Sequence, residues 1–337
     1  PPATHRVAGI RRPGGTALTA TEMPPTESPQ VDFTKGTSKV GDRVFGGLSI
    51  GAGFLILVTL AAVALFLISE AWPTFFADQS EFNPSNSFID YVGPLVFGTI
   101  WASVIALALA LPLAVAVALF VSHYAPKRLA ISLGYVIDLL AAIPSVVFGL
   151  WGIAVLAPIL AKSVYPWLED NLGFLPFFAG PASTSGRTML TAAAVLAVMI
   201  LPIITAISRE VFLQTPRLHE EASLALGATK WEMIRQSVPP YGRSGVISGA
   251  MLGLGRALGE TMAIAMILAP ADLITFNVIS NQNPNTIAAN IALKFPESSG
   301  IDVNRLIATG LVLFVITFIV NALARRVSNA GFSGAAG

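Results

Sequence analysis

The stretch SREVFLQTPRLHEEASLALGATKWEMIRQSVPPYGRSG, residues 208–245, separates two long apolar runs and predicts two short helices joined by a tight turn. Thr215 followed by Pro216 is typical of a helix N-cap and the first helical position. Gly227 is typical of the residue just past a helix end, where the backbone turns left-handed. We therefore expect the first helix of this hairpin to lie between Pro216 and Gly227.

A second helix is expected to follow directly. Thr229 and Glu232 form the pattern T-K-W-E, a capping box in which each side chain bonds the backbone N–H of the other residue. The pair Pro239–Pro240 is expected to end this helix, because proline lacks the backbone N–H that a helix interior needs. The result would be a compact, rigid hairpin that can transmit movement to the apolar runs on either side.

Three interpretations of the hairpin remain open on the residues alone. A DNA-reading helix–turn–helix fits the bare pattern, but this hairpin lacks a dense basic face and is tied to apolar runs at both ends. The second interpretation is a purely structural hairpin. The third is a docking element through which a separate ATPase drives the neighbouring helices.

The rest of the chain is too apolar for a soluble protein. Of its 337 residues 54% are hydrophobic and 12% charged, against roughly 25% charged in an ordinary soluble domain, and the mean hydropathy is +0.72. Apolar runs of about 20 residues are long enough to cross a bilayer. We therefore predict an all-α, polytopic membrane protein with six transmembrane helices, at about 45–69, 95–121, 130–160, 188–207, 244–268 and 305–324. Pro144 is expected to kink the third run or to leave its first part at the membrane interface.

Lysine and arginine concentrate in the segments that alternate spans place on one side of the membrane. The positive-inside rule assigns that side, and with it both termini, to the cytoplasm. The predicted organisation is a disordered cytoplasmic tail over 1–44, a six-span permease-like domain over 45–325 with a cytoplasmic loop at 208–243, and a cytoplasmic C-terminal tail over 326–337.

The segments expected on the outer side carry more acidic than basic residues, so they would not attract an anion that diffuses in from outside. In the last of them, Ile287, Ile291 and Phe295 follow Pro284 at helical spacing and predict a short interfacial helix. This helix either closes a loop or docks a partner.

Composition excludes several classes of protein. The chain has no cysteine, which excludes a disulfide framework, a thiolate zinc site and an iron–sulfur cluster. His5, His123 and His219 all lie outside the apolar runs, which argues against intramembrane haem ligands. The sequence contains no G-x-x-x-x-G-K-[ST], so the chain does not hydrolyse ATP through a P-loop of its own. We expect no catalytic residue, no metal site and no cofactor bound by this chain.

Arg256 and Glu260 are charged residues inside the fifth predicted span. Each needs a reason, because a charge near the bilayer centre costs about 2.5–3.5 kcal/mol on insertion scales. Four residues apart, they are expected on one face of the helix. They either form a structural ion pair, or Arg256 binds a substrate anion while Glu260 holds the arginine or accepts a proton. Asp138 lies nearer the end of its span and is not expected to be a ligand.

The fifth predicted span also carries glycines four residues apart, a spacing that permits close approach of a neighbouring helix. Gly249 and Gly253 lie on one face of the helix, and Gly255 and Gly259 on another. Beside mid-membrane charges, this spacing suggests that the span lines a tight pathway. The glycines do not form a nucleotide-binding fingerprint, because their spacing differs and no strand precedes them.

The first helix of the hairpin contains a sequence that resembles the signature of a known family. Glu221-Ala222-Ser223, with Gly227 four positions on, is similar to the EAA-x3-G signature of ABC importer permeases. In that family the short helix of this loop seats in a cleft of the ATP-binding subunit, which implies a coupling role for Glu221, Ala222 and Gly227. The sequence departs from the signature at Ser223, Ser237 and Pro239.

Two further segments, IPSVVFGLWG at 143–152 and GLGRALGETMAI at 253–264, are similar to PstC-type phosphate permeases within this family. The second segment contains Arg256 and Glu260, which implies that both lie in the substrate pathway. The resemblance covers roughly residues 45–325 and implies the type I ABC importer permease fold.

The resemblance also implies a function and partners. The chain would be a permease subunit of an ATP-driven importer of inorganic phosphate in the bacterial plasma membrane. Its partners would be a homologous PstA-type permease, two PstB-type ATP-binding subunits that hold ATP and magnesium, and an extracytoplasmic PstS-type phosphate-binding protein, besides membrane lipid; nucleic acid is not expected. Two alternatives stay open: a permease for another oxyanion such as sulfate, and an ion-coupled secondary transporter that works alone.

Overall fold

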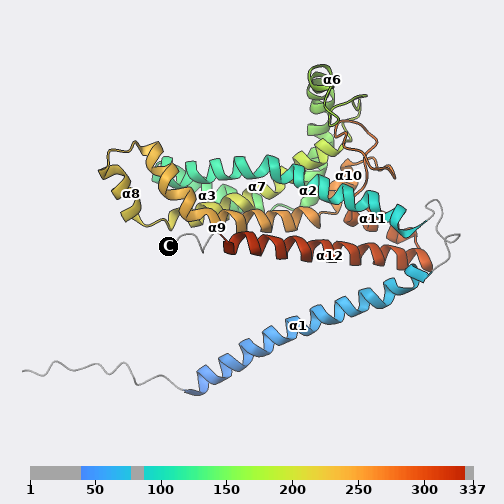
Figure 1. Cartoon of the computed structure of the whole chain (residues 1–337), viewed down its shortest axis with the longest axis horizontal. Coiled ribbons are helices and arrows are strands. Elements are labelled where there is room, and N and C mark those ends of the chain that lie inside the picture. Colours follow the sequence, from blue (N-terminus) through green and yellow to red (C-terminus); the bar gives the residue numbers. More distant parts are fainter. Residues whose placement is uncertain (1–38, 77–86, 331–337) are drawn as a thin grey trace, which may run out of the picture. The chain divides into compact units, whose positions relative to one another are not determined.

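The computed structural model describes residues 39–76 and 87–330, and this part of the chain folds into helices without a strand (Figure 1). The first helix, α1 (Lys39–Phe76), begins inside the predicted N-terminal tail. The last, α12 (Ile301–Ala330), extends into the predicted C-terminal tail. The remainder of both predicted tails lies outside the described residues.

The chain divides into two units, one ending at Thr59 and the other beginning at Leu60, and α1 crosses from the first to the second. The second unit contains the remaining helices. In order, they are α2 (Phe88–Leu119), the π-helical turn η2 (Phe120–Tyr124), α3 (Lys127–Ala141), α4 (Ser145–Trp151), η3 (Gly152–Leu156), α5 (Ala157–Ile159), η4 (Leu160–Val164), α6 (Tyr165–Leu172), α7 (Met189–Leu213), α8 (Arg217–Ala225), α9 (Lys230–Leu258), α10 (Met262–Ile267), α11 (Ile287–Lys294) and the 3-10 turn η5 (Phe295–Glu297). Two π-helical turns, Gly152–Leu156 and Leu160–Val164, join the segments Ser145–Trp151, Ala157–Ile159 and Tyr165–Leu172 into one continuous helix.

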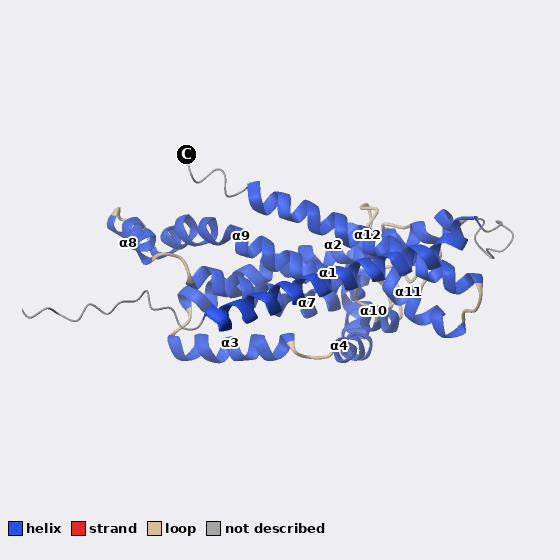
Figure 2. Ribbon diagram, turned by 90° about the horizontal axis from the view of Figure 1, so that it is seen from below, coloured by secondary structure: helices blue, strands red, loops and turns tan. Residues whose placement is uncertain are grey.

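Within the second unit, α2, α7, α9 and α12 run alongside one another as a bundle (Figures 1 and 2). The main core lies where α2 meets α7, with Leu196, Ile200 and Ile204 of α7 fully buried. Small side chains let the two helices approach closely, and close van der Waals contact is what drives helix association in lipid. On α2 these small residues recur every four positions: Ala102, Ala106, Ala110 and Ala114.

Five of the described helical segments are long and apolar enough to cross a membrane: Gly41–Phe76, Phe88–Tyr124, Ser145–Leu172, Met189–Leu213 and Ile301–Arg326. The predicted span 244–268 is not among them, so the described residues contain five such helices where the sequence predicts six. This segment is built in two pieces, the second half of α9 and the short α10, with a break at Gly259–Thr261. Gly259 favours the break, because glycine is a poor helix former.

The third predicted span, 130–160, is also divided. α3 ends at Ala141, and Pro144 then serves as the N-cap of α4 with an extended ψ of 138°. The helix running from α4 to α6 crosses the direction of the bundle (Figures 1 and 2). The expected discontinuity at Pro144 is confirmed, but the span boundaries are wrong, because proline disfavours helix at the residue before it and starts a new helix after it.

The Pro239–Pro240 pair does not end the second helix of the hairpin, contrary to the sequence expectation. α9 passes through both prolines and continues to Leu258. Ile234 and Val238 are buried before the prolines and pack in one cluster with Phe212 of α7. Gly242 meets the same ring after them. Packing on both sides of the pair therefore offsets the cost of about 3 kcal/mol for proline in a helix interior.

At the other end of the bundle, α11 begins at Ile287, where the sequence predicts the short helix, with Thr286 as its N-cap. The Ile287 N–H donates to Thr99 Oγ1 of α2 at 3.0 Å. Ile287 and Ile291 pack in one cluster with Tyr91 of α2. α11 thus holds the preceding loop against α2, as the loop-closing interpretation expects.

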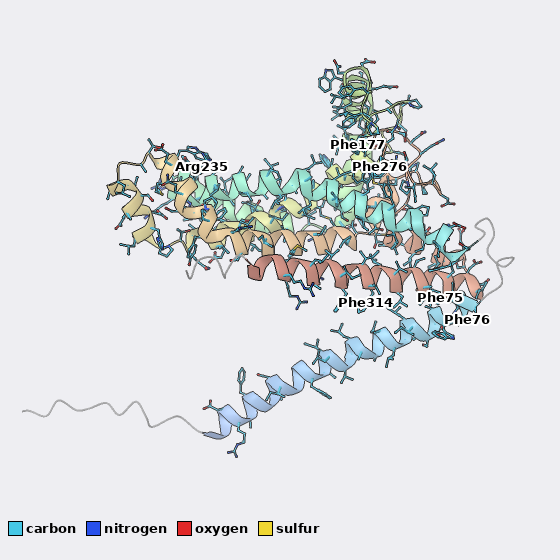
Figure 3. The ribbon with its side chains drawn as sticks, in the orientation of Figure 1. Phe75, Phe76, Phe177, Arg235, Phe276 and Phe314 are labelled. Atoms are coloured by element: carbon cyan, nitrogen blue, oxygen red, sulfur yellow. The ribbon has the colours of Figure 1, made fainter. Side chains whose placement is uncertain are left out.

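An aromatic cluster fixes two further loops to α2. Phe177 and Phe276 lie together, with ring centroids 6.4 Å apart, and both rings also contact Trp101 of α2 (Figure 3). In Figure 3, Phe177 and Phe276 lie far from Arg235, which belongs to the hairpin. The hairpin and the aromatic cluster therefore occupy different regions of the second unit.

Candidate functional site

The first helix of the hairpin, α8, begins one residue later than the sequence predicts. Pro216 is the N-cap residue and Arg217 the first helical one. Thr215 is buried, and its Oγ1 has no hydrogen-bond partner among the described residues, so it does not cap the helix. The extended ψ of 127° at Pro216 gives the reason, because a residue in this conformation stands outside the helix.

The end of α8 has the geometry that its glycine predicts. Gly227 has φ +88°, its N–H donates to Leu224 O at 3.0 Å, and the Ala228 N–H donates to Ser223 O at 3.2 Å. These two bonds form a Schellman motif, which satisfies carbonyl groups that would otherwise be unpaired at the helix end. Gly227 adopts a backbone conformation that other residues enter only at a cost.

α9 begins with the predicted capping box. Glu232 Oε2 accepts from the Thr229 N–H at 2.8 Å, and Thr229 Oγ1 accepts from the Glu232 N–H at 3.4 Å. The backbone N–H of Thr229, and then its hydroxyl, lower the pKa of the Glu232 carboxyl below its ordinary value. The turn between the two helices is therefore held by hydrogen bonds on both sides of Gly227.

The signature residues Glu221 and Ala222 are exposed on α8. Two leucines near them are also exposed, Leu218 at 76% and Leu226 at 89%. Trp231, at the start of α9, is 57% exposed. Exposed apolar side chains beside a carboxylate are typical of a surface that a protein partner covers.

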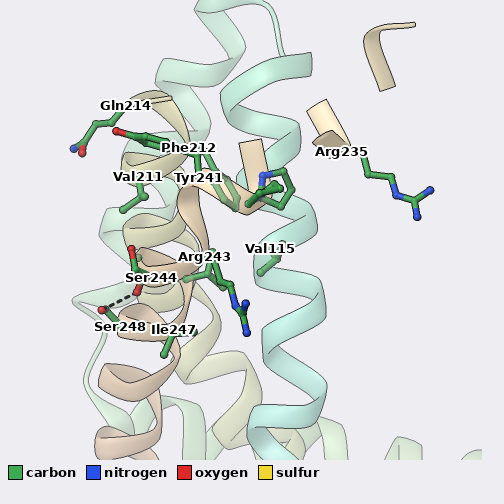
Figure 4. Close-up of a pocket in the computed structure, with 14 residues that line it drawn as sticks. Val115, Val211, Phe212, Gln214, Arg235, Tyr241, Arg243, Ser244, Ile247 and Ser248 are labelled. Carbon is green, nitrogen blue, oxygen red and sulfur yellow. Dashed lines mark hydrogen bonds between the residues drawn. The ribbon is translucent and has the colours of Figure 1, made fainter. Parts of the chain in front are cut away.

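A pocket of about 1290 Å³ lies beside the hairpin, where the ends of α2 and α7 meet α9 (Figure 4). Its walls are largely apolar, with the guanidinium groups of Arg235 and Arg243 as the charged groups. In Figure 4, Arg243 reaches toward Val115 of α2, whereas Arg235 points away from the other labelled side chains. The sequence contains no motif that would have predicted this pocket.

The structure separates Arg256 from Glu260. Because α9 ends at Leu258 and Gly259 is its C-cap, Glu260 lies outside the helix, and the expectation that both charges share one helical face is wrong. Arg256 is half-buried, and its Nη1 donates to Ala141 O at 3.4 Å. No ion pair within 4.0 Å joins Arg256 to Glu260, although both belong to the described part of the chain.

Glu260 is instead used by the next helix. Glu260 is buried, with 7% of the residue exposed, and its Oε1 accepts from the Ala263 N–H in the first turn of α10 at 3.0 Å. At the other end of α10, Arg187 donates to the carbonyl oxygens of Met266, Ile267 and Leu268 at 3.3–3.4 Å. Both ends of this short helix are therefore held by charged side chains.

The predicted glycine faces of α9 differ. A Cβ atom at Gly249 would lie 3.2 Å from Ile207, and one at Gly253 would lie 3.0 Å from Ile204, so both glycines sit against α7. At Gly255, by contrast, no atom of the described residues lies within 4 Å of such a Cβ position. At Gly259, the atoms within 4 Å of such a position are the backbone oxygens of Gly255 and Arg256. The second face, next to Arg256, is thus uncovered by the described part of this chain.

Two contacts of the hairpin were missed by the sequence analysis. Glu220 contacts His123, which is 97 positions away in the sequence, and Ser223 contacts Ser237 across the turn. The departures from the family signature at Ser223 and Ser237 drew attention to both serines, but only the fold brings them together. Nothing in the local sequence around His123 indicates a partner on α8.

Comparison with known proteins places this chain in a protein family. Residues 110–330 match the family model described as binding-protein-dependent transport system inner membrane component. Phosphate transport system permease protein PstC 2 of Mycobacterium tuberculosis is 43% identical over 306 residues, which cover 87% of this chain and 94% of that protein. Phosphate transport system permease protein PstC of Mesorhizobium japonicum is 38% identical over 305 residues, which cover 87% of this chain and 92% of that protein.

A solved structure shares the fold at low sequence identity. A bacterial alginate ABC transporter, in complex with an alginate pentasaccharide-bound periplasmic protein, aligns with a TM-score of 0.55 at 16% identity, over 85% of this chain and 96% of its own. At this identity the likeness concerns the fold alone, that of an ABC importer permease. This chain therefore belongs to the family of binding-protein-dependent transport system inner membrane components, and within it to the PstC-type phosphate transport permeases.

Proposed function

We propose that this chain is the transmembrane permease subunit of an ATP-driven importer of inorganic phosphate. The observation that carries the proposal is the continuity of α9, a helix of 29 residues that begins in the capped hairpin and contains Arg256 in its last turn. At 1.5 Å per residue this helix is about 43 Å long, so a movement of the hairpin reaches Arg256 without passing a flexible joint.

The comparisons favour this function over the two alternatives. Relatives named as phosphate permeases align over 87% of the chain, which favours phosphate over sulfate or another oxyanion. An ABC importer permease fold disfavours an ion-coupled secondary transporter that works alone. The chain is a multi-pass membrane protein and a transport component.

As a permease, the chain works with other subunits of an ABC importer, including a binding protein. In the proposal, two ATP-binding subunits hold ATP and magnesium, dock on α8 and hydrolyse ATP, while this chain itself contributes no catalytic residue and holds no cofactor. A homologous permease forms the other half of the pathway, and an extracytoplasmic phosphate-binding protein delivers the anion. The exposed face of α8 with Glu221 supports the docking surface.

Arg256 is the proposed phosphate contact in the pathway. It lies in the last turn of α9, two residues before the break, and irregular backbone at membrane depth is tolerated where it lines a cavity. Its described hydrogen bond to Ala141 O uses one of five N–H donors, and the planar fork matches phosphate oxygens. Glu260 supports this site indirectly, because its bond to Ala263 fixes the start of α10 beside the break.

The proposed mechanism is alternating access. Closure of the ATP-binding subunits moves α8, and α9 carries the movement to the region of Arg256, where the pathway opens to one side or the other. The glycines at 249 and 253 keep α9 in contact with α7 while it moves.

Labelled-phosphate uptake tests the proposal. In cells that lack this chain, wild type is expected to restore uptake that excess sulfate does not compete. Arg256→Gln at equal membrane levels is expected to reduce uptake by about tenfold or more, because hydrogen bonds to charged groups contribute about 1.5–3 kcal/mol. Arg243→Gln, an exposed arginine of the same helix, is the matched control and is expected to transport normally.

Three other outcomes would contradict parts of the proposal. Equal uptake by wild type and Arg256→Gln would remove Arg256 from the pathway, and loss of assembly in this variant would indicate a structural role. If wild type restored no phosphate uptake, the proposed substrate would be wrong.

A second variant tests the docking surface. Glu221→Lys is expected to insert normally but to lose most ATP-driven uptake while ATP hydrolysis persists, because the reversed charge faces the docked subunit. Glu210→Lys, an exposed carboxylate of α7 outside the hairpin, is the control. Normal uptake by Glu221→Lys would count against docking at this face.

A further inference from the structure

The coupling helix α8 is not held by buried side chains. None of its nine residues, all of them described, is buried. A helix without buried apolar residues gains little from packing, so polar contacts must set its position. The position of α8 therefore depends on its polar contacts with the end of α2 and with α9.

One contact joins α8 to the end of α2. His123 lies in η2, the π-helical turn at the end of α2, and its Nε2 is 3.4 Å from Glu220 Oε1 of α8. The two side chains are 10% and 24% exposed. Ser122 Oγ lies 2.7 Å from Nδ1, the other ring nitrogen of His123, and so fixes the orientation of the ring.

The same turn of α2 contacts the second arm of the hairpin. The ammonium group of Lys230, the first residue of α9, lies 4.8 Å from the centroid of the Tyr124 ring. Adjacent residues of η2 thus contact the two helices of the hairpin by a side-chain hydrogen bond and a cation–π interaction. A π-helical turn is a local distortion often found at functional sites.

The two arms of the hairpin are also joined to each other. Ser223 Oγ of α8 lies 3.1 Å from Ser237 Oγ of α9, and both hydroxyls donate to His219 O, at 3.1 and 3.3 Å. These serines are two of the three positions at which the sequence departs from the family signature. Polar bonds therefore join α8 to α9 here.

Glu220 and its neighbour Glu221 have different surroundings. Successive helical residues point about 100° apart, so one carboxylate faces α2 while the other is exposed. We propose that His123 and Glu220 are a positioning pair that fixes α8 to the end of α2, so that a movement of α8 reaches α2 as well as α9. This inference rests on the proposed coupling of α8 to an ATP-binding subunit.

The experiment uses the complete importer reconstituted in vesicles and measures phosphate transported per ATP hydrolysed. Glu220→Gln and His123→Gln are expected to lower this ratio by about threefold. His123→Lys places a cation opposite Glu220 and is expected to retain the ratio. All variants are expected to retain the ATP-binding subunits.

Three outcomes would overturn the proposal: a wild-type ratio in Glu220→Gln, failure of His123→Lys to retain the ratio, or loss of the ATP-binding subunits from Glu220→Gln, which would assign Glu220 to the docking surface. The chain contains no cysteine, so spin labels on Lys127→Cys and Leu226→Cys can report the distance between α3 and the hairpin. Glu220→Gln is expected to broaden this distance distribution, and an unchanged distribution would also overturn the proposal.

The label measurement needs no transport. If wild type carried no phosphate, the proposed function would fail, and the distance distributions would still decide whether the pair positions α8.

Discussion

The hairpin and the α7–α9 interface are stabilised in different ways. The hairpin has no buried residue in α8, and its shape follows from caps, a left-handed glycine and a few polar contacts. The α7–α9 interface has no comparable polar contacts in what the structure describes, and α9 lies against α7 through glycines. The glycines that contact α7 are Gly242, Gly245, Gly249 and Gly253.

This difference determines what each region tolerates. Side chains on the outer face of the hairpin can change without disturbing the fold, whereas its backbone conformation cannot. At the α7–α9 interface the backbone is an ordinary helix, but a methyl group at Gly242 or Gly245 would lie 2.6 Å or less from a side chain of α7. The hairpin can therefore present a variable surface to a partner while the interface below it keeps a fixed geometry.

The largest expected effect comes from filling the α7–α9 interface. A Cβ atom at Gly242 would lie 2.6 Å from the buried Phe212 ring, so Gly242→Val is expected to destabilise the protein by about 1–3 kcal/mol or more. Gly255→Ala, on the open face of the same helix, is the matched control and is expected to be neutral or slightly stabilising. Thermal unfolding in detergent measures both, and equal midpoints would refute the contrast.

A smaller effect is expected from the backbone of the hairpin. Gly227 has φ +88° with no atom of the described chain within 4 Å of a Cβ position, so Gly227→Ala adds backbone strain without a clash. We expect a local cost of about 1–2 kcal/mol and faster hydrogen exchange in the hairpin peptide. Gly227→Asn should cost less, because asparagine tolerates this conformation. Equal exchange in all three proteins would show that the turn does not need its glycine.

The smallest effect concerns the capping box and pH. The pKa of Glu232 is lowered in the folded protein, so its contribution is present above the ordinary value of 4.5 and is lost as the pH falls through the folded value. We expect hydrogen-exchange protection at the start of α9 to decrease in acid. Glu232→Gln should remove this dependence, and an identical pH profile in the variant would contradict the assignment.

Local patterns predicted the hairpin well because its signals act over a few residues. The capping box at Thr229 and Glu232, and the glycine at 227, each satisfy backbone groups within one turn. The sequence pattern placed the N-cap of α8 at Thr215, one residue before its actual position at Pro216. The reason is that a Thr-Pro pair is typical of an N-cap followed by the first helical residue. The coupling roles of Glu221 and Ala222 remain predictions.

Local patterns failed where distant packing decides. Pro239 and Pro240 read as a helix end, yet Phe212 of α7 holds α9 on both sides of them. Arg256 and Glu260 read as neighbours on one helix, yet the break at Gly259 separates them. The first error arises because a rule for isolated helices does not include the energy of packing against other helices. The second arises because a spacing of four residues was taken for one continuous helix, although Gly259 favours a break.

The sequence by itself determined that this protein is a helical membrane protein with a capped hairpin between two apolar segments, because hydropathy and capping depend on residues close together in the chain. Only the tertiary structure decided that α9 is continuous, that the segment 244–268 is divided, and that His123 meets Glu220. These features depend on contacts between helices far apart in the sequence, where packing and burial outweigh local preference.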